Sequence, residues 1–179
     1  FTEIIEPSPL RIRSFAASPS ADVVLYNVDD ATIAHSNRLR LYDAVQRQYL
    51  CDEPLTIPEI GVDSRDGPIL QWVGGRTFVI GNRFGLFVLT VREGVNETTS
   101  EDIKTLDAGN VYGITGTGRS GEFLVVYVPR EEAENPVLRT KIWQLNEDEP
   151  MVTFTPDEQL GSLASGGNGN VAVKALAIS

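Results

Sequence analysis

A short apolar segment that ends in an aromatic residue or leucine recurs three times along this chain. The copies, each printed with the one residue that follows it, are residues 39–43 (LRLYD), 86–90 (LFVLT) and 140–144 (TKIWQ). Their large terminal residues, Tyr42, Leu89 and Trp143, follow one another at intervals of about 50 residues, a period typical of stacked supersecondary units. Because a unit of this size cannot bury its own apolar face, the repeat predicts units that pack against one another.

Short apolar runs separated by turn residues make up the rest of the chain, and no window has the apolar spacing of a helix. Asn-Arg, Gly-Gly and Gly-Arg-Ser-Gly segments between the runs favour hairpins that join antiparallel neighbours. Grouped in fours, the runs predict three units, at residues 20–52, 68–107 and 110–155. A glycine-rich stretch at 156–170 is interpreted as a flexible connector, and the apolar residues 171–179 as the first strand of a further unit. The predicted strands of the three units are 23–26, 33–35, 39–42 and 48–50; 69–73, 78–80, 86–89 and 103–106; and 111–114, 123–126, 140–143 and 151–154.

The central strands of the first two units share one order of features. An apolar strand, a small residue, an Asn-Arg turn and a second apolar strand occur at residues 32–42 and again at 78–89. With Asp43 directly after Tyr42, these residues resemble the WD40-type β-propeller, whose four-stranded antiparallel blades carry Trp-Asp or a relaxed version of it at the end of the third strand. In the other two units threonine and glutamine replace that aspartate, and no Gly-His pair opens any unit. The resemblance covers most of residues 20–155 and implies an all-β propeller that binds proteins through its faces and edges. Another kind of propeller and a β-sandwich with similar hairpins are the alternatives.

Three units and one strand do not close a propeller, which typically has about 4–8 blades. The chain begins at Phe1 without a methionine and ends inside an apolar stretch. We therefore expect the ring to be completed by further blades outside this segment, and the alternative is a partner chain that covers the open edges.

The charge balance restricts the kinds of partner. With 25 acidic and 15 basic residues the net charge is −10, which repels a phosphate backbone and favours protein partners with basic surfaces over nucleic acid. No stretch approaches the ~18–20 apolar residues that a membrane helix needs. A single cysteine, Cys51, cannot form an internal disulfide, so we expect an intracellular protein, nuclear or cytoplasmic.

One charged insertion is the candidate site for partner binding. Residues 129–136 (PREEAENP) separate the second and third predicted strands of the third unit, where the other units have only short turns. Long loops on a repetitive scaffold are often functional. We expect partner contacts from the insertion, and the overall function to be that of a non-catalytic scaffold subunit in a larger intracellular complex. The candidate contact residues are Arg130, Glu131, Glu132, Glu134 and Asn135.

Motifs that would indicate catalysis or a cofactor are weak. Residues 116–121 (GTGRSG) match a dinucleotide fingerprint in spacing, but a β-rich run follows where the fingerprint needs a helix, so a hairpin is predicted. His35 is the only histidine, which leaves a structural role as its interpretation and predicts no cofactor and no metal. The alternative function is a carbohydrate-active or hydrolytic propeller whose carboxylates line the central channel. The candidate acidic pairs are at 29–30, 52–53, 101–102, 131–132 and 157–158.

Overall fold

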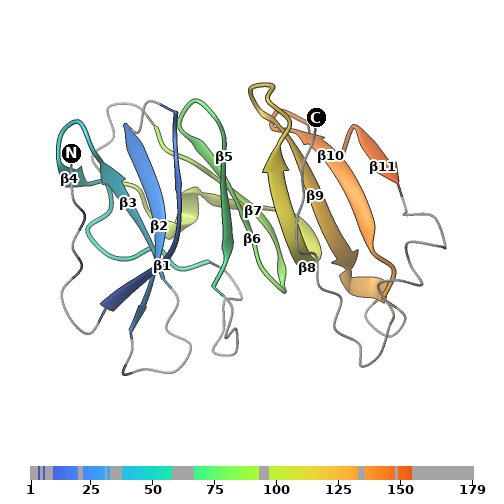
Figure 1. Ribbon diagram of the computed structural model, residues 1–179, viewed down its shortest axis with the longest axis horizontal. Coiled ribbons are helices and arrows are strands. Elements are labelled where there is room, and N and C mark those ends of the chain that lie inside the picture. Colours follow the sequence, from blue (N-terminus) through green and yellow to red (C-terminus); the bar gives the residue numbers. More distant parts are fainter. Residues whose placement is uncertain are drawn as a thin grey trace.

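The computed structural model describes residues 4, 6, 10–19, 22–30, 32, 38–57, 67–92, 97–132, 136–147 and 149–154. These residues form two antiparallel sheets and two short 3₁₀ helices, and no α-helix occurs among them (Figure 1). The all-β prediction is therefore confirmed for this part of the chain. The elements are β1 (Leu10–Ala17), β2 (Val23–Asp30), β3 (Arg38–Asp43), β4 (Gln48–Tyr49), β5 (Ile69–Gly74), β6 (Thr77–Gly81), β7 (Gly85–Thr90), η1 (Ser100–Asp102), β8 (Ile103–Gly116), β9 (Glu122–Pro129), η2 (Arg130–Glu132), β10 (Arg139–Gln144) and β11 (Val152–Phe154).

Strand β8 joins two units into one sheet. The first sheet has the order β1-β2-β3-β4, and the second has the order β11-β10-β9-β8-β7-β6-β5. Residues 103–108 of β8 pair with β7, whereas residues 109–116 pair with β9. We call β5–β7 with the first half of β8 the middle layer, and the second half of β8 with β9–β11 the third layer. Within the described residues both sheets are open and do not close into a ring.

A glycine occupies the point where β8 changes partners. Gly109 has φ +159°, and a β-carbon there would lie 2.6 Å from the carbonyl oxygen of Val128. Only a residue without a side chain allows the two backbones to approach this closely. The sequence predicted two strands, 103–106 and 111–114, with a break between them, and this is wrong because the glycine lets one strand continue across it.

The middle layer buries both of its faces. Side chains of β6 and β7 alternate, so that Phe78, Ile80, Phe87 and Leu89 pack against the first sheet while their neighbours pack against the third layer. Those neighbours are Val79, Leu86 and Val88. Figure 1 shows the resulting order across the molecule, with β1–β4, then β5–β7, then β8–β11. The chain thus stacks three β layers, unlike the two facing layers of a sandwich.

The three recurrent residues occupy the same register position. Each lies at the end of the third strand of its layer, opposite an apolar residue of the second strand. The cross-strand pairs are Val24–Tyr42, Phe78–Leu89 and Phe123–Trp143. Repetition of sequence is therefore matched by repetition of structure.

The strand prediction fails at the start of the first unit. Strand β1 precedes the predicted unit and was missed, because Arg11 and Arg13 and a bulge between Ile12 and Ser14 obscure its alternation. Strand β2 pairs directly with β3, so it is the second strand of its sheet and not the first. Of the predicted strand 33–35, as of the connector 156–170 and the strand 171–179, nothing falls within the described residues. The predicted strands of the second and third units are otherwise confirmed.

Candidate interaction groove at the 129–136 insertion

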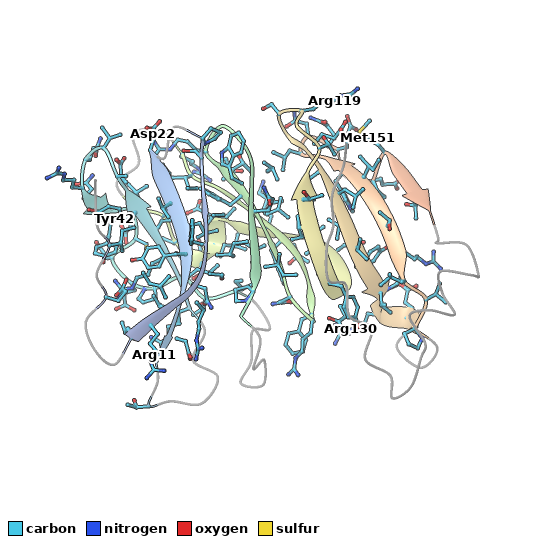
Figure 2. The ribbon with its side chains drawn as sticks, viewed as in Figure 1. Arg11, Asp22, Tyr42, Arg119, Arg130 and Met151 are labelled. Carbon is cyan, nitrogen blue, oxygen red and sulfur yellow. The ribbon has the colours of Figure 1, made fainter. Side chains whose placement is uncertain are left out.

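The insertion lies beside a cavity at the junction of the middle and third layers. Helix η2 follows β9 directly and places Glu131, which is exposed, at the rim of a cavity of about 290 Å³. Figure 2 shows Arg130 of this helix at the end of the third layer opposite to Arg119, which belongs to the β8–β9 hairpin. We call the cavity the insertion groove. Its lining includes Asp107, Tyr127, Glu131, Arg139, Lys141 and Thr153.

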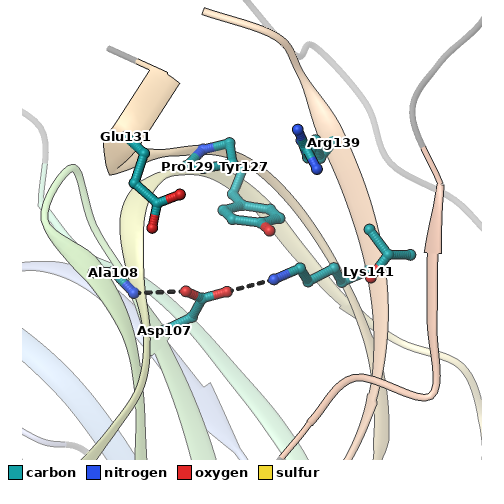
Figure 3. A pocket seen from close by; sticks show the side chains of 8 residues that line it. Asp107, Ala108, Tyr127, Pro129, Glu131, Arg139 and Lys141 are labelled. Atoms are coloured by element: carbon teal, nitrogen blue, oxygen red, sulfur yellow. Dashed lines mark hydrogen bonds and ion pairs between the residues drawn. The ribbon is translucent and has the colours of Figure 1, made fainter.

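An ion pair between two layers forms the floor of the groove (Figure 3). Lys141 Nζ on β10 lies 2.8 Å from Asp107 Oδ2, which is on the β8 segment that pairs with β7. The other oxygen of Asp107 accepts the backbone N–H of Ala108 at 2.8 Å. Lys141 also lies 4.7 Å from the centre of the Tyr127 ring, a cation–π distance. The pair therefore fastens the third layer to the middle layer.

The pKa of Lys141 reflects this position. Burial lowers the pKa, but hydrogen bonds to the Asp107 and Tyr127 side chains and the charge of Asp107 raise it by more, so the pKa lies above its ordinary value of 10.5. Lys141 is therefore protonated at neutral pH. Because the folded-state pKa is raised, the stability that it contributes is complete below pH 10.5 and is lost as the pH rises through the folded-state value.

Replacing Asp107 with asparagine should lower the free energy of unfolding by about 1–2 kcal/mol, since it leaves the ammonium group of Lys141, whose side chain is 17% exposed, without its carboxylate. Lys141→Met removes the ammonium charge that Asp107→Asn leaves unpaired. The double variant Asp107→Asn/Lys141→Met should therefore be more stable than the sum of the two single effects predicts. Urea denaturation at pH 7 measures all four proteins. Strict additivity would show that the pair contributes nothing across the layers.

The groove leaves one anionic group at its rim. Lys141 neutralises Asp107, and Arg139 is also engaged in an interaction. In the described part of the chain no hydrogen bond or ion pair is made by the Glu131 carboxylate, which is exposed to solvent. A basic side chain of a partner would find an available carboxylate there, beside an apolar wall of Tyr127 and Pro129.

The structure places only some of the predicted contact residues. Arg130 and Glu131 belong to η2, and Glu132 completes the helix, although its side chain lies outside the description, as do Glu134 and Asn135. Their role in binding remains a prediction. The groove residues on the strands, Asp107, Arg139 and Lys141, were missed. The available signal was the alternation of Arg139, Lys141 and Trp143 on one face of β10, which puts charged side chains next to a buried tryptophan.

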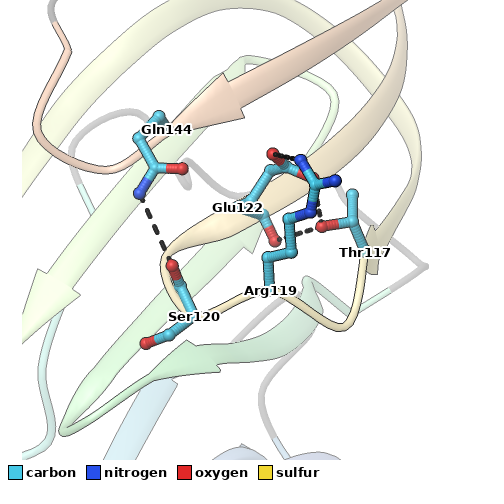
Figure 4. Close-up of polar contacts among 5 residues, drawn as sticks. All are labelled: Thr117, Arg119, Ser120, Glu122 and Gln144. Carbon is cyan, nitrogen blue, oxygen red and sulfur yellow. Dashed lines mark hydrogen bonds and ion pairs between the residues drawn. The ribbon is translucent and has the colours of Figure 1, made fainter.

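The glycine-rich segment is a hairpin, as predicted. It connects β8 and β9, and a strand follows it where a dinucleotide site needs a helix. Buried Glu122 accepts a hydrogen bond from Thr117 Oγ1 and lies 3.5 Å from Arg119 Nη1 (Figure 4). The backbone N–H of Gly121 donates to the Val73 carbonyl at 2.7 Å, which ties the hairpin to the middle layer. These contacts give Thr117, Arg119 and Glu122 structural roles in the hairpin.

Other candidate chemical groups also have structural roles. Asp29 forms an ion pair with Arg13 at 2.7 Å, and Asp102 accepts the N–H of Thr99 at 2.9 Å. Cys51 is buried, and burial raises the pKa of its thiol, which disfavours a reactive thiolate. In the residues that the structure describes, no group of three or more His, Cys, Asp or Glu side chains could hold a metal ion. His35 and the acidic pair at 157–158 lie outside those residues.

Comparisons with known proteins give one similarity of fold. No family model matches the sequence, and no curated protein matches it. A chain in a solved structure, "Crystal Structure of Mitotic Checkpoint Complex", is similar with a TM-score of 0.51 and 13% sequence identity. The similarity covers 84% of this chain but 40% of that chain, so this chain spans less than half of its neighbour's length. No helix among the described residues is long and apolar enough to cross a membrane. The comparisons thus show a similarity of fold and no more.

Proposed function

We propose that this protein is a non-catalytic scaffold subunit of the WD40-like propeller type, which binds protein partners within a larger intracellular complex. The observation that carries the proposal is the insertion groove, where a three-residue helix holds the exposed carboxylate of Glu131 above an ion pair that joins two layers. A rigid sheet framework with a charged insertion at one edge is suited to present contacts, since loops on rigid scaffolds commonly carry binding. The similarity to a chain of a multi-protein complex supports the same conclusion.

The partner surface that fits the groove is basic. The net charge of −10 attracts a positively charged protein over a long range, and Glu131 offers a local contact. Steering of this kind accelerates association and falls with ionic strength. We therefore expect partner binding to weaken as salt is added.

The finer architecture belongs to the same proposal. The three layers correspond to three blades, each of which shields the apolar face of its neighbour, and either further blades or a partner chain complete the ring. The alternating burial of β6 and β7 supports this interpretation, because a blade inside a ring must be apolar on both faces.

Replacing residues 131–135 with a Gly-Ser segment of equal length should leave the melting temperature unchanged and abolish co-purification of the partners. The sharper variant is Glu131→Lys, which should weaken binding about 10-fold through charge repulsion. Glu53→Lys is the matched control, because Glu53 is also exposed and lies outside the groove. Affinities are measured by calorimetry with the co-purified partner at two salt concentrations. Equal binding by the unmodified chain and both variants would remove the insertion groove from the proposal.

A further inference from the structure

One sheet face has an apolar hollow that no other layer covers. On the outer side of the first sheet, Phe15 is 70% exposed and Ile12 is 42% exposed. Beside them lies a hollow of about 260 Å³, lined by Ile4, Ile12, Phe15, Ala17, Val24 and Tyr26. We call this side the first-sheet face. Exposed aromatic and aliphatic residues that gather around a hollow are typical of an interaction surface.

The register shows what the equivalent faces contact. Val24 and Tyr42 form the cross-strand pair on the first-sheet face, because their neighbours Val23, Leu25 and Leu41 point into the core on the other side. The equivalent pair in the middle layer, Phe78–Leu89, is covered by the first sheet. The equivalent pair in the third layer, Phe123–Trp143, is covered by the middle layer. In the middle layer and in the third layer, the equivalent face is thus covered by an antiparallel β layer with alternating apolar side chains. In the described part of the chain the first-sheet face has no such cover.

A basic side chain next to this cross-strand pair forms an ion pair in both the first sheet and the third layer. Arg40 corresponds to Lys141, since each lies two residues before the terminal aromatic residue of its strand. Lys141 pairs with Asp107 from the neighbouring layer. Arg40 Nε instead lies 3.6 Å from Oε1 of Glu6, which precedes β1 in the chain. Glu6 therefore supplies from this chain the carboxylate that a neighbouring layer supplies elsewhere.

The composition of the face is that of an interface. Tyr26 and Arg40 occupy the positions that Ile80 and Phe87, both apolar and buried, occupy in the middle layer. The Tyr26 hydroxyl donates to Glu6, and Arg40 lies 5.2 Å from the centre of the Tyr49 ring, which meets the ring of Tyr42 edge-on. Tyrosine and arginine are enriched at protein interfaces, where they combine a large contact area with polar anchoring. Tyr26 and Arg40 thus combine an apolar contact area with polar contacts to Glu6 and Tyr49.

One buried oxygen indicates a polar contact from the occupant. Glu6 has a side chain that is only 2% exposed, and its Oε2 has no hydrogen-bond partner in the described part of the structure. A buried acceptor without a donor is costly, so an occupant that brings an N–H group to Glu6 gains binding energy.

We propose that the first-sheet face docks an antiparallel β layer of a partner protein, which covers Ile12, Phe15 and Val24 with alternating apolar side chains. The inference rests on the proposed scaffold function and names the surface that its partner occupies. A second copy of this chain fits poorly. The faces that cover the equivalent pairs of the middle and third layers are already buried in the core of each copy. Two copies would also each carry a net charge of −10.

Site-specific photo-cross-linking of the full chain tests the proposal. Phe15 is replaced with p-benzoylphenylalanine in the cells that express the protein, and cross-linked peptides are identified by mass spectrometry. The matched control carries the same amino acid at Val45, which is also 70% exposed but lies in the turn between β3 and β4. The expected result is a cross-link from position 15, absent from position 45, to a β-strand of another protein. A cross-link to the same chain or to a second copy, or none above the control, overturns the proposal.

The protein so identified is then purified, and its affinity is measured by calorimetry. Phe15→Asp should weaken binding at least 10-fold at an unchanged melting temperature, because an exposed side chain contributes little to folding. Unchanged affinity overturns the proposal. If Phe15→Asp binds normally while the Gly-Ser replacement of residues 131–135 abolishes binding, the inference fails and the scaffold function stands. If neither variant loses a partner, both fail.

Discussion

Replacing Phe78 with alanine should lower the free energy of unfolding by about 3–5 kcal/mol. Phe78 is 0% exposed and lies in the cluster between the first sheet and the middle layer, where its neighbours come from both. The substitution removes the buried area of the ring and leaves a cavity that two sheets cannot close without shifting as whole bodies. Equilibrium denaturation in urea, followed by tryptophan fluorescence, measures the change.

Phe15→Ala is the matched control, because it makes the same chemical change on the face that no layer covers. Its expected effect is within about 0.5 kcal/mol, since Phe15 is 70% exposed. Similar losses for the two variants would contradict the three-layer packing. The difference between them reports how much of the stability comes from the contact between layers.

Replacing Gly109 with alanine should cost about 2–4 kcal/mol, because the β-carbon meets the Val128 carbonyl at 2.6 Å and the backbone has φ +159°. The obstacle is backbone, so it cannot rotate away as a side chain would. Relief requires β8 and β9 to separate at the point where β8 leaves the middle layer. Thermal unfolding measures the loss.

Gly116→Ala on the same strand provides the comparison. A β-carbon at Gly116 would lie 3.8 Å from its nearest neighbour, an ordinary contact, so this variant should unfold near the temperature of the unmodified protein. If the two alanine variants were equally stable, the close approach at Gly109 would have no role in letting β8 continue from one layer to the next.

The sequence was sufficient to predict the strands of the middle and third layers, because there apolar alternation and turn chemistry coincide. It was insufficient at β1, where Arg11 and Arg13 replace apolar residues and a bulge shifts the register. It also failed at Gly109, because a glycine that ends a strand and a glycine that lets it continue look the same in sequence. Which of the two occurs depends on whether a second backbone approaches it, and β9 does so here.

The insertion could be found from the sequence, but the groove could not. Excess length and charge identify residues 129–136 without any knowledge of the fold. Asp107 and Lys141 are far apart along the chain, and they meet only because β8 crosses from one layer to the next. No pattern within either segment encodes that meeting. Long-range ion pairs of this kind therefore become visible only once the layers are placed.

Strand β8 also determines where this protein can be divided. Because residues 103–108 hydrogen-bond to β7 and residues 109–116 to β9, a break between Ala108 and Gly109 would leave each half paired with its own layer. What such a break would remove is the continuous backbone that sets the position of the third layer relative to the middle layer. The first sheet shares no strand with them and contacts the middle layer through packed apolar side chains, so any sheet exchanged for it would have to keep that apolar surface.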